Sequence, residues 1–150
     1  MDRTRHLSYL KVMVFDNFAK GKKAQWFISD KLKHSFSYTP DAGKATALLG
    51  NTDHAYNQVW HLPVDPKTLT GKEFIDMAAK AFGVAPDYMI LKRWMVQMAG
   101  LFIGDIKESV EMLYQSENDY LFDSSKFNKT FDFKTTSYQD GLAEVAKSYL

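Results

Sequence analysis

The chain has 150 residues, which is enough for one domain with a buried core, and its 45% hydrophobic and 25% charged residues are typical of globular proteins. The net charge of +1 provides no overall field that would attract a nucleic acid or a membrane surface, and the absence of cysteine excludes disulfides, thiolate metal sites and a cysteine nucleophile. The charged first residues do not resemble a signal peptide, and no apolar run approaches the roughly 18 residues of a membrane helix. We therefore expect a cytoplasmic protein.

Predicted helices and strands alternate in the first third of the chain. Apolar residues at helical spacing predict a helix over residues 8–20, with Gly21 as its stop. The short apolar and aromatic run at 24–28 predicts a strand. A Thr-Pro-Asp sequence, typical of a helix start, predicts a second helix over residues 39–50, with the hydroxyl of Thr39 as its cap.

The middle of the chain continues this alternation. Residues 58–62 (Gln-Val-Trp-His-Leu) predict a strand that a proline ends. Thr70 and Glu73 have the spacing of a capping box, and the helix that follows carries its apolar residues on one face up to Gly83. Residues 88–91 predict another short strand.

The last third is predicted to be mainly helical. We expect an apolar helix over residues 93–102, a further helix after Gly104, a last strand at 120–122, a short helix capped by residues 123–125, and a final helix that begins at Ser137. The whole pattern predicts an α/β or α+β-like fold, with a small sheet of about four short strands and about six helices.

The motifs of several enzyme classes are missing from the sequence. No two glycines are separated by a single residue, so there is no glycine-rich dinucleotide or phosphate loop. The four histidines lack metal-binding spacings, and no Gly-x-Ser-x-Gly motif occurs, so we expect neither a metal site nor a serine hydrolase. Several lysines surround Trp26 and Phe27; we interpret them as a solvated helix end and loop and expect no nucleic-acid binding.

One apparent catalytic motif is interpreted as a coincidence. Tyr88 and Lys92 match the Tyr-x-x-x-Lys spacing of the acid/base pair in short-chain dehydrogenases. That spacing works on a helix, where both side chains share one face. In the strand predicted here, the two side chains would be about 13 Å apart.

A longer segment carries a family resemblance. Residues 34–45 (His-Ser-Phe-Ser-Tyr-Thr-Pro-Asp-Ala-Gly-Lys-Ala) resemble the Arg-Asp-Phe-Val-Tyr-Val-Asp-Asp-Val-Ala-Arg-Ala stretch of extended short-chain dehydrogenases, the nucleotide-sugar epimerases and dehydratases. Residues 58–62 are similar to a later Val-Tyr-Asn-Val-Gly strand of that family, and residues 69–74 to its Leu-Thr-x-x-Glu-Leu helix start. Residues 123–135 and 137–142 resemble its closing segment and last helix. The order and spacing of these motifs carry the resemblance.

The resemblance covers roughly residues 8–150 and implies the substrate-binding, C-terminal part of an NAD-dependent epimerase/dehydratase-like protein. In the family, the glycine-rich loop and the catalytic Tyr–Lys helix precede the matching region. We therefore expect residues 1–150 to form a single substrate-binding-type domain that lacks the N-terminal NAD-binding domain and is not catalytically competent alone. No cofactor is expected to bind this chain by itself, although NAD(P) is implied for the full-length family.

The resemblance also implies a set of substrate-binding residues. His34 stands where the family has an arginine that grips the phosphate of a sugar nucleotide, and a neutral imidazole in place of a fixed bidentate cation argues against a diphosphate ligand. From the residues alone, His61 beside Trp60 is interpreted as a core or subsite histidine rather than a catalytic one. The substrate contacts that we expect come from His34, Phe36, Tyr38, Trp26, Trp60 and His61.

Loss of the NAD-binding domain has a consequence for partners. It would leave apolar surface in water, at about 25 cal/mol for each Å² exposed. We therefore expect a homodimer, a domain-swapped oligomer, or a separate NAD-binding chain as partner, and a small molecule as substrate. The alternative is a noncatalytic module with an inherited fold that binds a small ligand or another protein, in which Trp26, Tyr38 and Trp60 would line a small apolar pocket.

Overall fold

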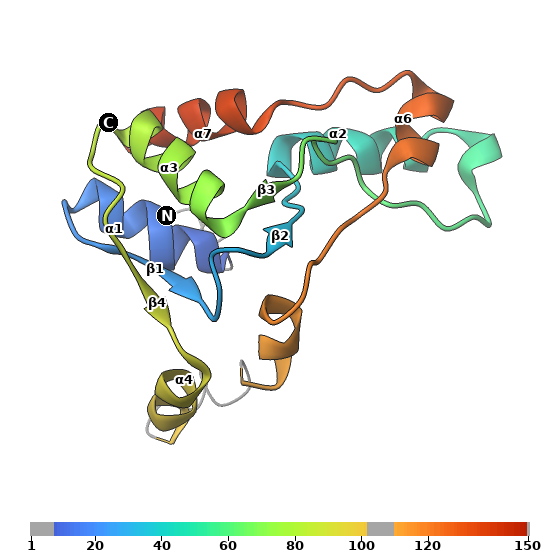
Figure 1. Cartoon of the computed structure of the whole chain (residues 1–150). Helices are drawn as coiled ribbons and strands as arrows, with labels where there is room; N and C mark the ends of the chain where they lie inside the picture. Colours follow the sequence, from blue (N-terminus) through green and yellow to red (C-terminus); the bar gives the residue numbers. More distant parts are fainter. Residues whose placement is uncertain (1–7, 102–109, 150) are drawn as a thin grey trace.

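The computed structural model describes residues 8–101 and 110–149 and shows a mixed α/β fold (Figure 1). Helices make up most of the described part of the chain, and its four short strands form two separate two-stranded sheets. The coarse prediction of a mixed fold with short strands is thus confirmed. The prediction of a single small sheet is wrong, because the four described strands form two separate pairs. The helix predicted after Gly104 lies largely outside the described residues.

The first helix supplies one wall of the core. A π-helical segment, η2 (Lys11–Phe15), runs directly into α1 (Asp16–Ala19), so the predicted helix is confirmed. Its inward side chains Met13, Val14, Phe15 and Phe18 are buried. Gly21 follows with a φ of 63°, a left-handed conformation that glycine adopts without steric cost.

Both sheets join segments that are distant in the sequence. β1 (Ala24–Phe27) pairs in parallel with β4 (Tyr88–Leu91), and both strands were predicted. β2 (Lys33–His34) pairs antiparallel with β3 (Leu69–Thr70), which was not predicted because two residues carry no recognisable pattern. Parallel strands need a long crossover, and here the crossover contains the second sheet and two helices.

Two predicted strands do not form. Residues 58–62 are irregular, and Tyr120 makes only an isolated bridge to His34. A strand is stable only when a neighbouring strand accepts its backbone hydrogen bonds. Within the described residues, no backbone–backbone hydrogen bond involves residues 57–62, so the apolar pattern at this segment has no sheet to join.

Two well-capped helices pack across the core. α3 (Gly71–Phe82) begins with the predicted capping box, in which Thr70 Oγ1 accepts from the backbone N–H of Glu73, and Gly83 ends it with a φ of 67°. α7 (Tyr138–Lys147) begins as predicted after Ser137, whose hydroxyl oxygen accepts from the N–H of Asp140. The two helices pack against each other, and Phe74 and Leu142 are buried there.

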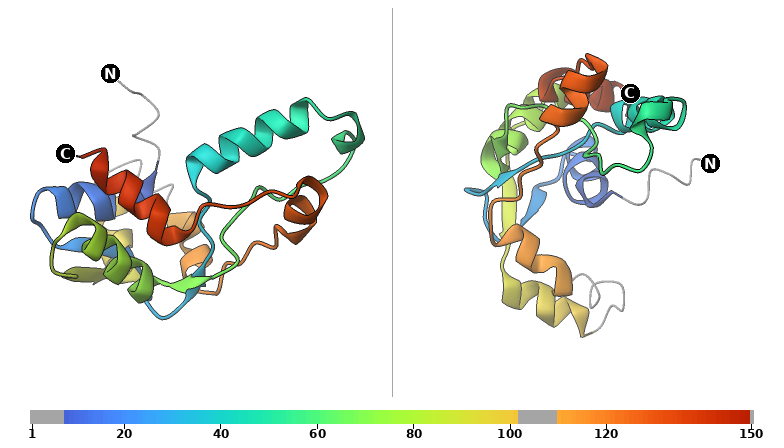
Figure 2. Two further views of the ribbon diagram at one scale, coloured as in Figure 1. Left: turned by 90° about the horizontal axis from the view of Figure 1, so that it is seen from above. Right: turned by 90° about the vertical axis from the view of Figure 1, so that its right-hand side faces the viewer.

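The remaining helices extend away from this body in two directions (Figures 1 and 2). α2 (Thr39–Gly50), η3 (Asp53–Ala55) and α6 (Ser125–Phe131) make one end, and α4 (Arg93–Gly100) with η4 (Met112–Ser116) makes another. α2 spans the predicted residues, but the predicted cap is wrong. Tyr38 holds the cap position and makes no capping hydrogen bond, because Thr39 is already the first helical residue.

The contact between Gly71 and Trp26 joins the first sheet to α3. Trp26 is 4% exposed, and a Cβ atom added at Gly71 would lie 2.4 Å from its indole Nε1. The indole therefore occupies the space that any larger residue at position 71 would need. Its N–H donates to the carbonyl of Ser29 at 3.1 Å, which leaves the ring little freedom to move aside.

Replacing Gly71 with alanine should therefore destabilise the protein by about 1–3 kcal/mol, because it forces a rigid ring out of a packed site. Gly43→Ala is the matched control. Gly43 is an exposed position inside α2 with open space around it, so alanine there should stabilise by about 1 kcal/mol through helix propensity. Urea unfolding of both variants measures the difference, and equal effects at the two glycines would contradict the packing argument.

Candidate functional site

The end of β2, the first turn of α2 and the residues that connect them lie between two cavities. We call residues 34–41 the Phe36 segment. Its residues from Phe36 to Asp41 line a cavity of about 320 Å³, and those from His34 to Phe36 line another of about 290 Å³. We call these the Tyr38 cavity and the His34 cavity. Every residue of the segment thus lines at least one cavity, and Phe36 lines both.

Aromatic contacts hold the Phe36 ring in place between the cavities. Its centroid lies 4.9 Å from that of Phe74 and 6.2 Å from that of Trp26, which meets it edge-on. The His34 ring also stacks on it, with the centroids 6.2 Å apart and an interplanar angle of 18°. Aromatic pairs at these separations attract beyond simple area burial. The shared wall of the two cavities is therefore fixed by the core.

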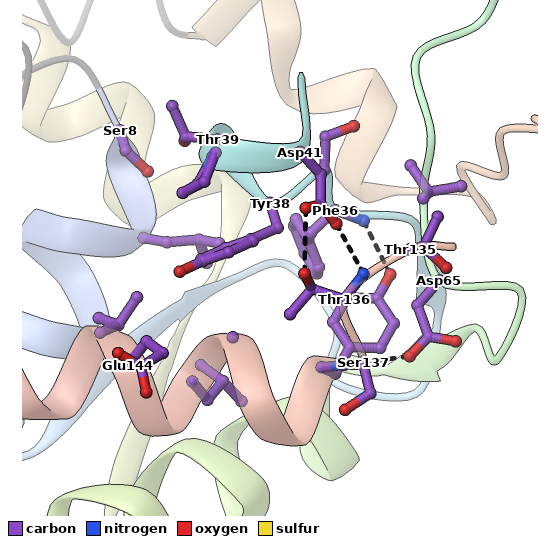
Figure 3. A pocket seen from close by; sticks show the side chains of 18 of the residues that line it. Ser8, Phe36, Tyr38, Thr39, Asp41, Asp65, Thr135, Thr136, Ser137 and Glu144 are labelled. Carbon is purple, nitrogen blue, oxygen red and sulfur yellow. Dashed lines mark hydrogen bonds between the residues drawn. The ribbon is translucent and has the colours of Figure 1, made fainter. Parts of the chain in front are cut away.

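Hydrogen bonds from the C-terminal segment frame the Tyr38 cavity (Figure 3). Asp41, 3% exposed, accepts from the backbone N–H of Thr136 at 2.6 Å and from its hydroxyl at 3.0 Å. The backbone N–H of Phe36 donates to the hydroxyl oxygen of Tyr138 at 3.0 Å, and the N–H of Tyr138 donates to Asp65 at 3.0 Å. These hydrogen bonds hold residues 36–41, Asp65 and residues 136–138 together around one apolar cavity.

The phenols of this region are poor acid/base groups. Burial raises the pKa of Tyr138, and burial together with the negative charges of Glu144 and Asp41 raises the pKa of Tyr38. Both phenols therefore remain protonated at neutral pH. The Tyr38 cavity can pack and hydrogen-bond a ligand, whereas proton abstraction by either tyrosine is unfavourable.

The apparent Tyr-x-x-x-Lys motif has the opposite electrostatics from a catalytic pair. Tyr88 lies in β4, in an extended backbone, as its interpretation as a coincidence requires. Its hydroxyl donates to Asp30 at 2.6 Å, and this hydrogen bond, followed by burial, raises the pKa of the phenol to about 12. A catalytic phenol needs a nearby cation to lower its pKa.

The His34 cavity contains a buried imidazole. His34 is 8% exposed, and its Nε2 lies 3.1 Å from the backbone carbonyl of Gln115. The strand β2 and the bridge to Tyr120 fix its backbone. Its Nδ1 is buried and has no hydrogen-bond partner. Unpaired buried polar atoms are uncommon in folded proteins.

The structure separates the other expected contact residues from these cavities. Trp26 lies in the core. Trp60 packs on Phe127 and Phe131 near α6, with Lys126 Nζ 4.1 Å from the centroid of its ring. The Nδ1–H of His61 donates to the carbonyl of Asp123 at 2.9 Å. Of the six expected residues, His34, Phe36 and Tyr38 are brought together, and Trp26, Trp60 and His61 are not.

Sequence reasoning missed the partners that complete the two cavities. Asp41 and Thr136 are 95 residues apart in the sequence, and His34 and Gln115 are 81 apart. No spacing rule relates residues at such separations. Only the polar character of Thr136 and Gln115 was visible, and it is shared by many surface positions.

Residues 8–101 and 110–149 contain no cluster of three or more side chains that could hold a metal ion. None of the helices described in residues 8–101 and 110–149 has the length and apolar character needed to cross a membrane.

Comparison with protein-family models, with curated proteins and with solved structures gives no match in any of the three.

Asp41→Asn should destabilise the protein by about 1–3 kcal/mol, because one carboxylate oxygen that now accepts from Thr136 would be replaced by an amide donor. The measurement is the free energy of unfolding in urea. Asp53→Asn, at an exposed position of η3, is the control and should change stability by less than about 0.5 kcal/mol. A loss at Asp53 equal to that at Asp41 would show that the buried pair is unimportant.

Proposed function

We propose that this chain is the substrate-binding, C-terminal part of an NAD-dependent nucleotide-sugar epimerase/dehydratase-like protein of the extended short-chain dehydrogenase family. The observation that carries the proposal is the position of the Phe36 segment. The segment in which the family resemblance begins is also the segment whose every residue lines a cavity. Cavities of this size lie at the lower end of the range for small-molecule sites, roughly 300–1,000 Å³.

The order of the elements supports the same proposal. A helix that ends at Gly21, then β1, the Phe36 segment and α2 follow one another as the resemblance implies. The capping box at Thr70 and the helix start at Ser137 also lie where the family pattern would place them. These agreements are local, and they support a common arrangement without identifying a substrate.

The loop at residues 56–62 supports the need for a partner domain. Val59 is 81% exposed, Tyr56 53% and Leu62 37%, although the segment has the composition of a strand. Within the described chain, none of the backbone groups of residues 57–62 pairs with another backbone group, and the carbonyl of Val59 accepts from Lys126 Nζ. We propose that this loop becomes a strand when an NAD-binding domain supplies the neighbouring strand.

The proposal divides the chemistry between two units. The NAD-binding domain would hold NAD(P) and supply a phenol of lowered pKa, and the present chain would bind and orient the substrate. The raised pKa values of Tyr38 and Tyr138 agree with a binding role. The proposal includes the cytoplasmic location that the sequence predicts.

Fusing the chain behind the nucleotide-binding half of an extended short-chain dehydrogenase should protect the backbone amides of residues 57–62 from hydrogen exchange, because they would then donate to a neighbouring strand. Exchange is measured by mass spectrometry for the chain alone and for the fusion. β1 is the internal control, because its amides are already paired with β4 and should not change. Val59→Pro removes one strand donor and should reduce the gain in the fusion.

The same fusion tests the division of the chemistry. NADH should bind to the fusion with saturation and should not bind to the chain alone. Micromolar binding of NADH by the chain alone, or unprotected amides at residues 57–62 in the fusion, would overturn the proposed function.

Without its partner domain, the chain should form a homodimer or a domain-swapped oligomer, because apolar side chains on the loop and beside it are exposed. Light scattering at increasing concentration measures the mass. The double variant with Val59→Lys and Leu62→Lys should shift the equilibrium towards monomer, because it replaces exposed apolar side chains with like charges. Gln58→Lys, at the exposed polar position next to Val59, is the control, because it adds a charge without removing apolar surface. A stable monomer of the unmodified chain at high concentration would contradict the expectation.

A further inference from the structure

The lining of the Tyr38 cavity combines buried apolar side chains with exposed polar ones. Phe15, Phe74 and Leu142 line the cavity and are buried. Ser8 and Thr39 also line it, and both are exposed, so the cavity is open to solvent on that side. A ligand can therefore enter the cavity and place an apolar face against the buried side chains.

Five hydroxyl groups in this lining are not used within the described chain. Their side-chain oxygens make no hydrogen bond to residues 8–101 or 110–149, and they belong to Ser8, Ser37, Tyr38, Thr39 and Thr135. Figure 3 shows Thr135 on the opposite side of the cavity from Ser8, so these hydroxyls do not gather at one point. A hydroxyl both donates and accepts, so it can pair with a hydroxyl of a ligand, but it cannot neutralise a full charge.

The charged groups in the lining are all acidic. Asp41, Asp65 and Glu144 line the cavity, and no lysine, arginine or histidine occurs among the described residues of its lining. The effect of these charges reaches the cavity, because burial, followed by the charges of Glu144 and Asp41, raises the pKa of Tyr38. A carboxylate or phosphate inside the cavity would lose water and meet three like charges.

The same carboxylates are poor partners for a cation, because each already has one. Asp41 and Asp65 accept from backbone N–H groups of residues 136–138. Glu144 pairs with Lys147 at 2.7 Å. An ammonium group would give up its water for acceptors that are already engaged, and the loss of hydration offsets the attraction. The lining therefore favours a ligand without charge.

The volume of the cavity admits one sugar unit. At roughly 30 Å³ for each water-sized unit, a cavity of about 320 Å³ has room for about ten such units. A six-membered sugar ring with its hydroxyls is close to this size, whereas a sugar joined to a nucleoside diphosphate is much larger. From a nucleotide sugar, only the sugar would enter the cavity, and the diphosphate and the nucleoside would lie outside it.

We infer that the Tyr38 cavity holds the sugar unit of the substrate, and that this unit is an uncharged hexose rather than a uronic acid or a sugar with a free amine. This inference deepens the proposed function and rests on it, because it names the class of nucleotide sugar and the cavity that receives the sugar. The carbon–hydrogen face of the ring packs against the buried side chains, and the unused hydroxyls of the lining pair with those of the sugar. The diphosphate stays outside the cavity, in agreement with a nucleotide-sugar substrate.

Three methyl glycosides that differ in charge test the inference on the unmodified chain. Methyl glucoside is neutral, methyl glucuronide carries a carboxylate, and methyl glucosaminide carries an ammonium group. Chemical-shift titration at low ionic strength should show the glucoside binding about tenfold more tightly than the glucuronide, and at least as tightly as the glucosaminide. Added salt should narrow the difference between the glucoside and the glucuronide, because it screens the charges at the open side of the cavity.

Two glutamate variants separate a local charge from the net charge. Glu144→Gln removes one carboxylate from the lining and should reduce the preference for the glucoside over the glucuronide by about threefold. Glu111→Gln changes the net charge equally, but Glu111 is exposed and lines neither cavity, so the preference should not change. Equal effects of the two variants would assign the preference to the net charge of the chain and overturn the inference.

Two tryptophan variants locate the site. Ser148→Trp places a large side chain in the lining of the Tyr38 cavity and should abolish binding of methyl glucoside. Ser125→Trp adds the same side chain at an exposed position that lines neither cavity and should leave binding unchanged. If Ser148→Trp does not fold, the amides of the unmodified chain that shift with methyl glucoside locate the site instead. Shifts confined to the lining of the His34 cavity would overturn the inference.

The inference is also overturned by equal affinities for the glucoside and the glucuronide, by tighter binding of the glucosaminide, or by no binding of any of the three. These outcomes are separate from failure of the proposed function. If methyl glucoside binds in the Tyr38 cavity while the fusion to a nucleotide-binding half gains neither NADH binding nor amide protection, the cavity remains a sugar site and the epimerase/dehydratase-like role fails. If the fusion succeeds and methyl glucoside does not bind, only the assignment of the sugar fails.

Discussion

The close approach of the Trp26 indole to Gly71 is the constraint on which the arrangement of both cavities depends. Because position 71 has no side chain, the indole can lie against the first turn of α3 and present its edge to Phe36. Phe74, one turn further along α3, completes the contact at 4.9 Å from Phe36. One glycine therefore allows a strand, a helix and the Phe36 segment to share a single aromatic junction. The wall between the two cavities is a product of core packing.

The cavities are closed by groups that come from the other end of the chain. Asp41 binds Thr136, Tyr138 binds Phe36, and Gln115 binds His34. Two of these bonds join the Phe36 segment to residues 136–138, and the third joins it to Gln115. Such contacts close long loops, at an entropic cost that the rest of the fold must offset. The binding geometry therefore depends on long-range contacts, although the segment at its centre is local.

The sequence predicts the elements that are decided by neighbouring residues. The capping box at Thr70, the stop at Gly83 and the cap at Ser137 require only three or four residues, and they appear in the structure as predicted. Pairing is different, because it depends on what lies beside a segment. The strand at 88–91 found a parallel partner in β1, whereas the equally strand-like segment at 58–62 found none. An apolar pattern shows that a segment favours a strand conformation, but it does not show whether another strand lies beside it.

The candidate site was predictable to a similar extent. His34, Phe36 and Tyr38 are close in sequence, so one motif could indicate all three. Trp26 was expected to contact substrate, yet aromatic side chains are also the largest contributors to a core, and its indole is used there. Trp60 is likewise used at another place, where it packs against the rings of α6.

The exclusion of water from the cavities affects both the charge of the ligands that they can bind and the ability of their tyrosines to abstract protons. Removing water from an aromatic-lined space penalises charge, so it raises the pKa of Tyr138 and, with nearby carboxylates, that of Tyr38. Proton abstraction by these phenols is therefore disfavoured. The same loss of water strengthens a hydrogen bond between neutral partners, because no solvent competes for the donor or the acceptor. An environment that opposes acid/base catalysis thus favours recognition of an uncharged ligand.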